Sequence, residues 1–214
     1  SEREGDNLYA SSIVALDLKT GKYRWHFQMV HHDIWDYDAP SPTVLFDATI
    51  DGKPVKGIGE AAKTGWLYLL DRTNGKPIYP IPETPVPQNA NQKTSPTQPI
   101  PSLAPFATHV PTPEQVARVK AVAGVDKAIV SERIFTPFWK DLVVVAPGAA
   151  GGTNWPPSSY DPVNNLFFVC GQDSVAGVTS DTEDAPKRGA NGAAGLAMGS
   201  TGALGNGLDR KSTR

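Results

Sequence analysis

Residues able to do chemistry gather in one stretch of the chain, residues 31–40. The stretch reads His-His-Asp-Ile-Trp-Asp-Tyr-Asp-Ala-Pro and follows a strand-like run. If its backbone is extended, side chains alternate between two faces, so Asp36 and Asp38 project together and the two aromatic residues project the other way. Two carboxylates on one face suit a hard cation or a proton acceptor. In the alternative interpretation, Asp33 and Asp36 are turn residues whose side chains bond the backbone.

A lysine lies within a sequence that is close to the phosphate-binding loop. Residues 57–64 (Gly-Ile-Gly-Glu-Ala-Ala-Lys-Thr) nearly match G-x-x-x-x-G-K-[ST], with Ala62 in place of the last glycine. That loop binds phosphates only where a helix follows it, and residues 66–71 read as a strand. The sequence therefore argues against nucleotide hydrolysis. Lys63 remains either a cation placed just before a buried strand or a solvated loop lysine.

The third candidate stretch is residues 150–157, which read Ala-Gly-Gly-Thr-Asn-Trp-Pro-Pro. The glycines allow a ligand to approach the main chain closely, and Asn154 offers an amide to hydrogen-bond it. The alternative is a plain glycine turn with Trp155 in the core.

Composition and charge limit the classes of function. Hydrophobic residues make up 39% of the 214 residues, enough for a globular core, and a net charge of −2 leaves no basic field to attract nucleic acid. No apolar run approaches the roughly eighteen residues that span a bilayer. Cys170 is the single cysteine, so no internal disulfide is expected, and its apolar neighbours predict a buried thiol. The first residue is not methionine, and we expect a piece of a longer chain.

Strand-forming runs recur along the chain. Residues 12–17 and 22–28 predict a β-hairpin around a Lys-Thr-Gly-Lys turn. A strand that ends at aspartate before a short turn returns at Asp71 and, more weakly, at Asp161. Asp17 and Asp71 are 54 residues apart, a spacing typical of one propeller blade per repeat. The hairpins predict an all-β propeller architecture, of which three repeats are too few to close a ring.

The segment between the second and third repeats has a different character. The proline-rich run 80–105 lacks the backbone donors that a central strand needs, so it predicts an extended surface loop. Thr112 as N-cap, a proline after it and Gln115 three residues on predict one short helix, which stops at Gly124. Residues 142–146 predict a short buried strand.

Taken in order, these motifs resemble the middle of pyrroloquinoline quinone (PQQ) dependent dehydrogenases, and most of all the membrane glucose dehydrogenase branch. The resemblance covers about residues 1–175 and rests on residues 6–9, 15–25, 32–38, 63–65, 70–75, 85–88, 95–99 and 152–155. It implies that residues 1–180 are part of an eight-bladed quinoprotein β-propeller, with a proline-rich insertion at about 80–132. Residues 181–214 form a Gly/Ala-rich segment that matches no pattern.

The resemblance also implies roles for the candidate residues. Asp36 would be the catalytic base, and Lys63 would bind the quinone oxygens and stabilise the charge that develops on the ring. Asn154 and Trp155 would line the cofactor, and Asp36 and Asp38 would be ligands of Ca²⁺ or a lanthanide ion. Other ligands and the tryptophan that lies under the quinone fall outside the match, so the chain alone is expected to be inactive.

The implied reaction is oxidation of an alcohol or sugar hydroxyl to the carbonyl, with hydride transfer to the quinone. Electrons would pass to cytochrome c or a membrane quinone, nucleic acid would not be a partner, and the remaining blades would complete the site. The implied location is the periplasm, with membrane association through segments outside this chain. The alternative is a non-catalytic β-propeller scaffold that binds proteins and has no clustered acids.

Overall fold

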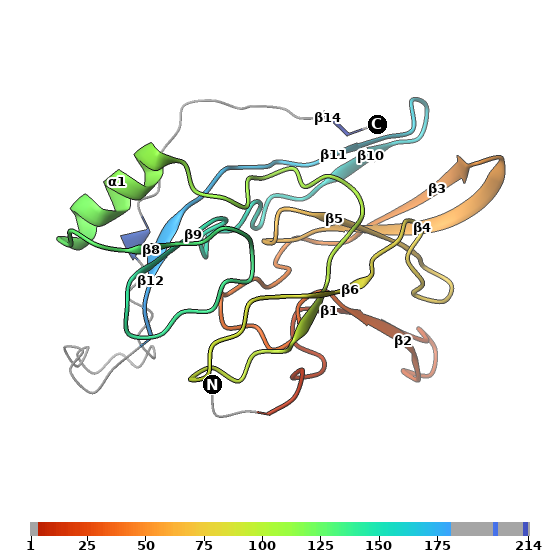
Figure 1. Cartoon of the computed structure of the whole chain (residues 1–214). Helices are drawn as coiled ribbons and strands as arrows, with labels where there is room; N and C mark the ends of the chain where they lie inside the picture. Colours follow the sequence, from red (N-terminus) through yellow and green to blue (C-terminus); the bar gives the residue numbers. More distant parts are fainter. Residues whose placement is uncertain (1–3, 181–198, 201–211, 214) are drawn as a thin grey trace.

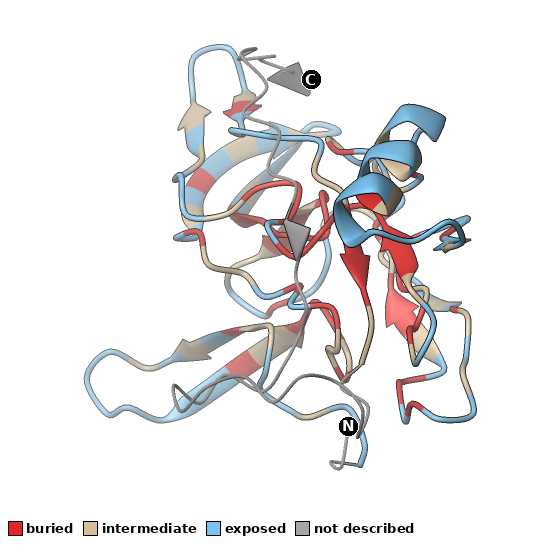
Figure 2. Ribbon diagram, turned by 90° about the vertical axis from the view of Figure 1, so that its left-hand side faces the viewer, coloured by how far each residue is buried: buried red, intermediate tan, exposed pale blue. Residues whose placement is uncertain are grey.

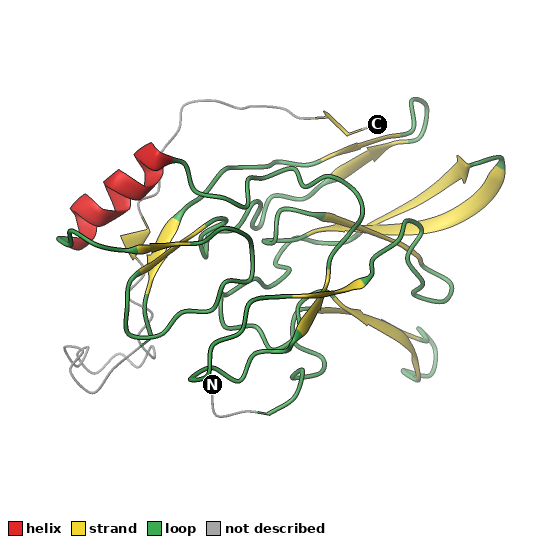
Figure 3. Cartoon of the chain, viewed as in Figure 1, coloured by secondary structure: helices red, strands yellow, loops and turns green. Residues whose placement is uncertain are grey.

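Short strands joined by long loops make up most of the computed structural model, which describes residues 4–180, 199–200 and 212–213 (Figure 1, Figure 3). One α-helix is present in this described part. The elements, in chain order, are β1 (Ser12–Leu16), β2 (Tyr23–Gln28), β3 (Val44–Ile50), β4 (Lys53–Ala61), β5 (Leu67–Asp71), β6 (Glu83–Pro85), β7 (Thr97–Pro99), α1 (Pro113–Ala123), β8 (Ile129–Val130), β9 (Val143–Val145), β10 (Ser159–Asp161), β11 (Leu166–Phe168), β12 (Ala176–Val178), β13 (Gly199–Ser200) and β14 (Ser212–Thr213). The predicted all-β class with one short helix is confirmed.

The strands form five small sheets. Their orders are β1-β2, β3-β4-β5, β6-β7, β10-β11-β14 and β13-β12-β9-β8. Only β8 and β9 pair in parallel; the other pairs among the described strands are antiparallel. Buried residues run through the centre of the molecule, where the sheets meet (Figure 2). Apart from β13 and β14, the predicted Gly/Ala-rich segment 181–214 lies outside the described residues.

The first and third predicted hairpins are present as β1-β2 and β10-β11, whereas the turn after β5 leads to a single bridge between Leu70 and Pro77; an aspartate caps each of the three turns. A side-chain oxygen of Asp17 accepts from Thr20 N (2.9 Å), and one of Asp71 accepts from Thr73 N (2.8 Å). Asp161 accepts in the same way from the backbone N–H of the residue two positions on (2.8 Å). Aspartate favours such turns because its carboxylate can bond the backbone just ahead of it. Because this bond joins residues two or three positions apart, the sequence pattern alone predicts these turns.

A tryptophan joins the first hairpin to the middle sheet. Trp25 of β2 is buried, and its indole N–H donates to Arg72 O at 3.0 Å. Its ring covers Gly75, where a Cβ would lie 2.6 Å from Trp25 Cε3. Gly75 also has a φ of +73°, a conformation that glycine adopts without steric cost. Contact between the hairpin and the turn after β5 therefore requires glycine at this position.

The middle sheet, β3-β4-β5, packs against the sheet that contains β11 at a glycine residue of β4. On β4, the ring of Phe46 from the paired strand β3 lies against Gly57, and a Cβ at Gly59 would lie 2.7 Å from the ring of Phe167 on β11 of the next sheet. The opposite face of β4 carries Ile58 and Glu60, which line a cavity of about 510 Å³ beside β1. The strand is thus covered on both faces.

The helix and the buried strand occur where the sequence predicts them. Thr112 Oγ1 accepts from Gln115 N, the Gln115 side chain accepts from Thr112 N, and the helix ends at the left-handed Gly124. Val119 is the buried residue of α1 and lies against Gly177 of β12. All three residues of β9 are buried, as predicted. Within the described residues, no helix has the length and apolar character to cross a membrane.

Two expectations from the sequence are wrong. The proline-rich run is not all extended loop, because β6 and β7 pair as a short antiparallel ribbon with Thr84 opposite Gln98. The prolines take the end positions of these strands, where the missing donors interrupt little of the ladder. Cys170 is exposed rather than buried, because it lies beyond the end of β11 and only Phe167 of that strand points into the core.

Candidate functional site

Lys63 lies between two of the predicted site carboxylates. Its Nζ is 2.6 Å from Asp38 Oδ1 and 3.1 Å from Asp36 Oδ2. The lysine side chain is 7% exposed, whereas the two aspartates are 45% and 52% exposed. Burial opposes the charge on Lys63, but hydrogen bonds to Asp38 and Asp36 outweigh it and raise the pKa of the ammonium. The interpretation of Lys63 as a solvated loop lysine is therefore wrong.

Aromatic residues anchor the loop that carries the two aspartates. The rings of Trp35 and Tyr37 stack at 15° and both meet Phe135 edge-on. Trp35 Nε1 donates to Thr136 O (2.8 Å), and the Tyr37 hydroxyl donates to Pro147 O (2.6 Å). Burial raises the pKa of Tyr37, so its hydroxyl stays a donor. The predicted separation of aromatic and acidic side chains is confirmed.

The backbone of this loop is not simply extended. Asp33 Oδ1 accepts from Trp35 N at 2.8 Å, which makes Asp33 the turn residue of the alternative interpretation. Asp36 has a φ of +65°, in the left-handed region where aspartate and asparagine are tolerated better than most residues. Because strained backbone collects at functional sites, this conformation adds weight to Asp36 as a chemically important residue.

A tight turn between β4 and β5 positions Lys63. Ala62 N donates to Trp66 O (3.1 Å), and Gly65 within the turn has a φ of +80°. Strand β5 follows the turn directly, so no helix N-terminus faces this lysine. The prediction that residues 57–64 are not a phosphate-binding loop is confirmed.

The glycine-rich stretch closes over the lysine. A Cβ at Gly151 would lie 2.4 Å from Lys63 Cγ, and one at Gly152 would lie 2.7 Å from Gly65 Cα. Gly152 N also donates to Lys63 O at 2.8 Å. The glycines are therefore needed for the loop to pack directly on the lysine stem and its turn. The sequence suggested that the main chain of this loop could approach a ligand closely. In the structure, the main chain approaches Lys63 and its turn.

Asn154 and Trp155 are placed differently by the same stretch. Ser41 Oγ, three residues beyond Asp38, donates to Asn154 O (2.7 Å) and so ties the two loops together. The Asn154 amide donates to Ala150 O (3.1 Å) in its own loop. Trp155 is 78% exposed, so its interpretation as a core residue is wrong. The chain leaves the packed glycine loop at this point and runs along the surface toward β10.

Three further polar side chains lie near the site, and the sequence reasoning gave none of them a role in it. Burial, with repulsion from Asp36 as a further cause, raises the pKa of Asp33 to about 6. The hydroxyl of Thr153 is buried and has no partner within the described part of the chain. His109 Nε2 donates to Thr64 O (2.8 Å), the ring meets Trp66 edge-on, and burial lowers the pKa of the imidazole. No spacing signal links His109 to a turn 45 residues earlier.

Known proteins of similar sequence include quinoprotein dehydrogenases. The chain is 39% identical over 165 residues to "Quinoprotein glucose dehydrogenase" of Escherichia coli (strain K12), covering 72% of this chain and 20% of that protein. It is 52% identical over 172 residues to the protein of the same name from Gluconobacter oxydans (strain 621H), covering 75% and 21%. The chain thus spans about a fifth of the length of these relatives.

Structural comparison agrees with the sequence relatives. The crystal structure of quinohemoprotein alcohol dehydrogenase from Comamonas testosteroni matches with a TM-score of 0.53 and 35% identity, over 83% of this chain and 22% of that one. Residues 1–203 match the family described as "PQQ: Glucose/ethanol/alcohol dehydrogenase, beta-propeller domain". The resemblance inferred from the motifs, and the propeller fold that it implied, are confirmed. The chain belongs to the PQQ glucose/ethanol/alcohol dehydrogenase β-propeller family.

Proposed function

We propose that this chain supplies the acid–base part of a PQQ-dependent dehydrogenase site that oxidises an alcohol or sugar hydroxyl to the carbonyl. The observation that supports it most is the shared contact of Lys63 Nζ with Asp36 and Asp38. A buried ammonium between two half-exposed carboxylates places positive charge and proton acceptors at one accessible point. A scaffold that only binds proteins needs no such cluster.

Asp36 is the catalytic base in this proposal. Lys63 hydrogen-bonds Oδ2 of Asp36 and so orients the carboxylate, leaving Oδ1 to take the hydroxyl proton. The exposure of Asp36 lets a small substrate reach it, while the aromatic anchors of Trp35 and Tyr37 hold the loop in place. Proton removal from the hydroxyl prepares the adjacent C–H bond for hydride loss.

The residues around Lys63 fit a quinone whose oxygens carry negative charge. Its ammonium is the donor that such oxygens require, and the unpartnered hydroxyl of Thr153 lies in the adjoining glycine loop. Gly151 and Gly152 let this loop pack directly on the Lys63 stem and its turn, which holds the ammonium in place. When bound, PQQ would supply the hydride acceptor. Asn154 and Trp155 stay as proposed lining residues.

The same residues fit only part of a metal site. Asp36 and Asp38 offer the oxygen ligands that Ca²⁺ or a lanthanide prefers. Within the described residues, however, no three His, Cys, Asp or Glu side chains gather closely enough to hold a metal ion. The chain would therefore contribute two ligands, and the remaining ones would come from other parts of the propeller. The electron acceptor, a cytochrome c or a membrane quinone, and the periplasmic location also belong to this proposal.

Asp36→Asn tests the proposal directly. Asparagine accepts the left-handed backbone of residue 36 and removes only the charge and the basicity. In the full-length protein with PQQ and Ca²⁺ or a lanthanide, we expect dye reduction with alcohols and sugars to fall by about 10²- to 10⁴-fold. Asp51→Asn is a matched control, because Asp51 is exposed and also has a positive φ of +49°. Unchanged turnover in Asp36→Asn would reject Asp36 as the base.

A further inference from the structure

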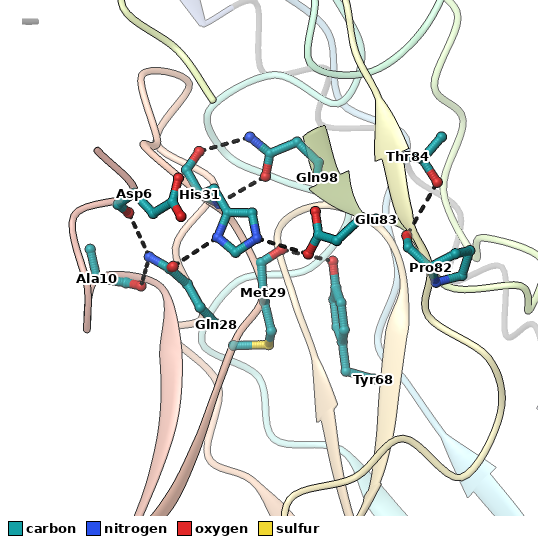
Figure 4. Close-up of polar contacts among 10 residues, drawn as sticks. All are labelled: Asp6, Ala10, Gln28, Met29, His31, Tyr68, Pro82, Glu83, Thr84 and Gln98. Atoms are coloured by element: carbon teal, nitrogen blue, oxygen red, sulfur yellow. Dashed lines mark hydrogen bonds and ion pairs between the residues drawn. The ribbon is translucent and has the colours of Figure 1, made fainter. Parts of the chain in front are cut away.

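Two side chains of the β6–β7 ribbon hydrogen-bond His31, the residue at which the loop that carries Asp36 begins (Figure 4). Gln98 of β7 is fully buried. Its Oε1 accepts from His31 N (2.8 Å), and its Nε2 donates to His31 O (2.7 Å). The two bonds satisfy both main-chain groups of His31, as a paired strand would. One side chain of the proline-rich insertion thus fixes the backbone of a residue 67 positions away.

The side chain of His31 is held as well, between two acceptors. Its Nδ1 lies 2.8 Å from Gln28 Oε1, and its Nε2 lies 3.0 Å from Glu83 Oε1 on the ribbon. The Gln28 amide cannot be turned round, because its Nε2 donates to Asp6 O (2.7 Å) and Ala10 O (3.2 Å), which only accept. Its oxygen therefore faces the imidazole. Both ring nitrogens face acceptors, so the two hydrogen bonds are complete only when each nitrogen carries a proton.

The acceptor on the ribbon is the carboxylate of Glu83, which is half exposed and belongs to β6. Tyr68 of β5 also reaches this segment, where its hydroxyl donates to Met29 O at 3.3 Å. Burial raises the pKa of Tyr68, so it adds no charge. A charge-assisted bond to Glu83 and two amide bonds to Gln98 therefore join the ribbon to His31.

We propose that His31 is a positioning residue, through which the β6–β7 ribbon fixes the loop that carries Asp36. The inference rests on the proposed function, since it assigns Asp36 as the base. Trp35 and Tyr37 hold the loop against Phe135 on either side of Asp36, and the ribbon holds the start of the loop at His31. With the loop fixed at these places, the left-handed conformation of Asp36 is maintained and its carboxylate stays beside Lys63.

The ribbon contact is tested by kinetics in the full-length protein with PQQ and Ca²⁺. We expect Gln98→Leu, which removes both amide bonds, to lower kcat about tenfold or more while KM changes less than about twofold, because the base is misplaced and substrate contacts are not. Gln88→Leu is the control, since the Gln88 amide bonds only carbonyls within the insertion, such as Val86 O and Ser95 O. Equal kcat values in the two variants would overturn the proposal.

Glu83→Gln provides a second variant, because Glu83 is half exposed and its change leaves the core intact. We expect a smaller fall in kcat than in Gln98→Leu, again without a matching rise in KM. Glu132→Gln is the control for loss of one exposed carboxylate. If Glu83→Gln behaved like Glu132→Gln, the side chain of His31 would have no part in positioning.

A readout that does not depend on turnover is the protonation of the His31 ring. Nitrogen-15 NMR of the histidine-labelled chain at neutral pH should show both His31 ring nitrogens as protonated, and Glu83→Gln should reduce that population. A wild-type ring with one unprotonated nitrogen would contradict the charged state. If Asp36→Asn left turnover unchanged, the proposed function would fail, yet this NMR result would stand. If only Gln98→Leu were silent, the positioning role alone would fail.

Discussion

Gly151 lies so close to Lys63 that a Cβ at residue 151 would be 2.4 Å from Lys63 Cγ. Gly151→Ala must therefore displace the lysine stem and also adopt a φ of +78°. We expect unfolding free energy to fall by about 2–4 kcal/mol, from left-handed strain and overpacking together. Chemical denaturation measures this, and a titration with PQQ should show weaker binding by the full-length variant.

Gly21→Ala separates the two causes of that loss. Gly21 has a φ of +66°, but no atom lies within 4 Å of the position that its Cβ would take. It should cost only the backbone strain, about 1–2 kcal/mol. Equal losses in Gly21→Ala and Gly151→Ala would mean that contact with Lys63 contributes nothing.

Lys63→Met should reduce function far more than stability. The methionine retains the apolar stem against Gly151 but removes the ammonium that Asp36 and Asp38 share. Because both carboxylates are about half exposed, water can replace much of the lost interaction, and we expect about 1 kcal/mol of destabilisation. Loss of a donor to developing charge should lower kcat by about 10²- to 10³-fold. Steady-state kinetics and denaturation of the same variant compare the two effects.

Glu60 should make the chain less stable as pH rises. Its carboxylate is buried beside β1 with neither oxygen bonded within the described residues, and burial raises its pKa to about 8. The unfolded state loses this proton near the usual pKa of 4.5, whereas the folded state keeps it to about pH 8. Unfolded chains therefore bind fewer protons across that window, and stability falls by roughly 3–5 kcal/mol before levelling off.

Glu60→Gln should remove this dependence, because the amide has nearly the same shape and does not ionise. Urea denaturation at pH 5 and pH 8 measures it: the wild-type difference should shrink by a few kcal/mol in the variant. The exposed Glu132 provides the comparison, since Glu132→Gln should leave the difference intact. A slope that persisted in Glu60→Gln would mean that another group causes it.

Thr112→Ala should weaken α1 without affecting the site. The variant loses the N-cap bond to Gln115 N and half of the capping box, a cost of about 1 kcal/mol. Because the strands that α1 contacts are β12 and β13, kcat should not change. Thermal unfolding and steady-state kinetics check the two statements. A changed kcat would show that the helix is coupled to the site.

The features that sequence reasoning found are those fixed by nearby residues. Turns capped by Asp17 and Asp71 use bonds that reach two or three residues ahead, so their pattern is visible in any short window. The N-cap at Thr112 is equally local. The gathering of Asp36 with Lys63 was inferred from resemblance to a family, because 27 residues separate them and no local rule joins them.

The features that sequence reasoning missed depend on contacts between residues far apart in the chain. Pairing of β6 with β7 is hidden by the prolines, and the bonds from Gln98 to His31 span 67 residues. Cys170 was misjudged, and the alternative interpretation of Trp155 as a core residue is wrong, because local composition does not show which other segment covers a residue. Neither side chain is covered here.

Gly59, on one face of β4, determines how closely the neighbouring sheet can approach. Because the ring of Phe167 on β11 rests on Gly59, main-chain atoms of β4 set the distance between these two sheets. One added methyl at Gly59 would act as a spacer that pushes β11 outward. The glycine loop over Lys63 leads into that sheet. A single methyl group added on β4 would therefore also displace the loop that packs on Lys63.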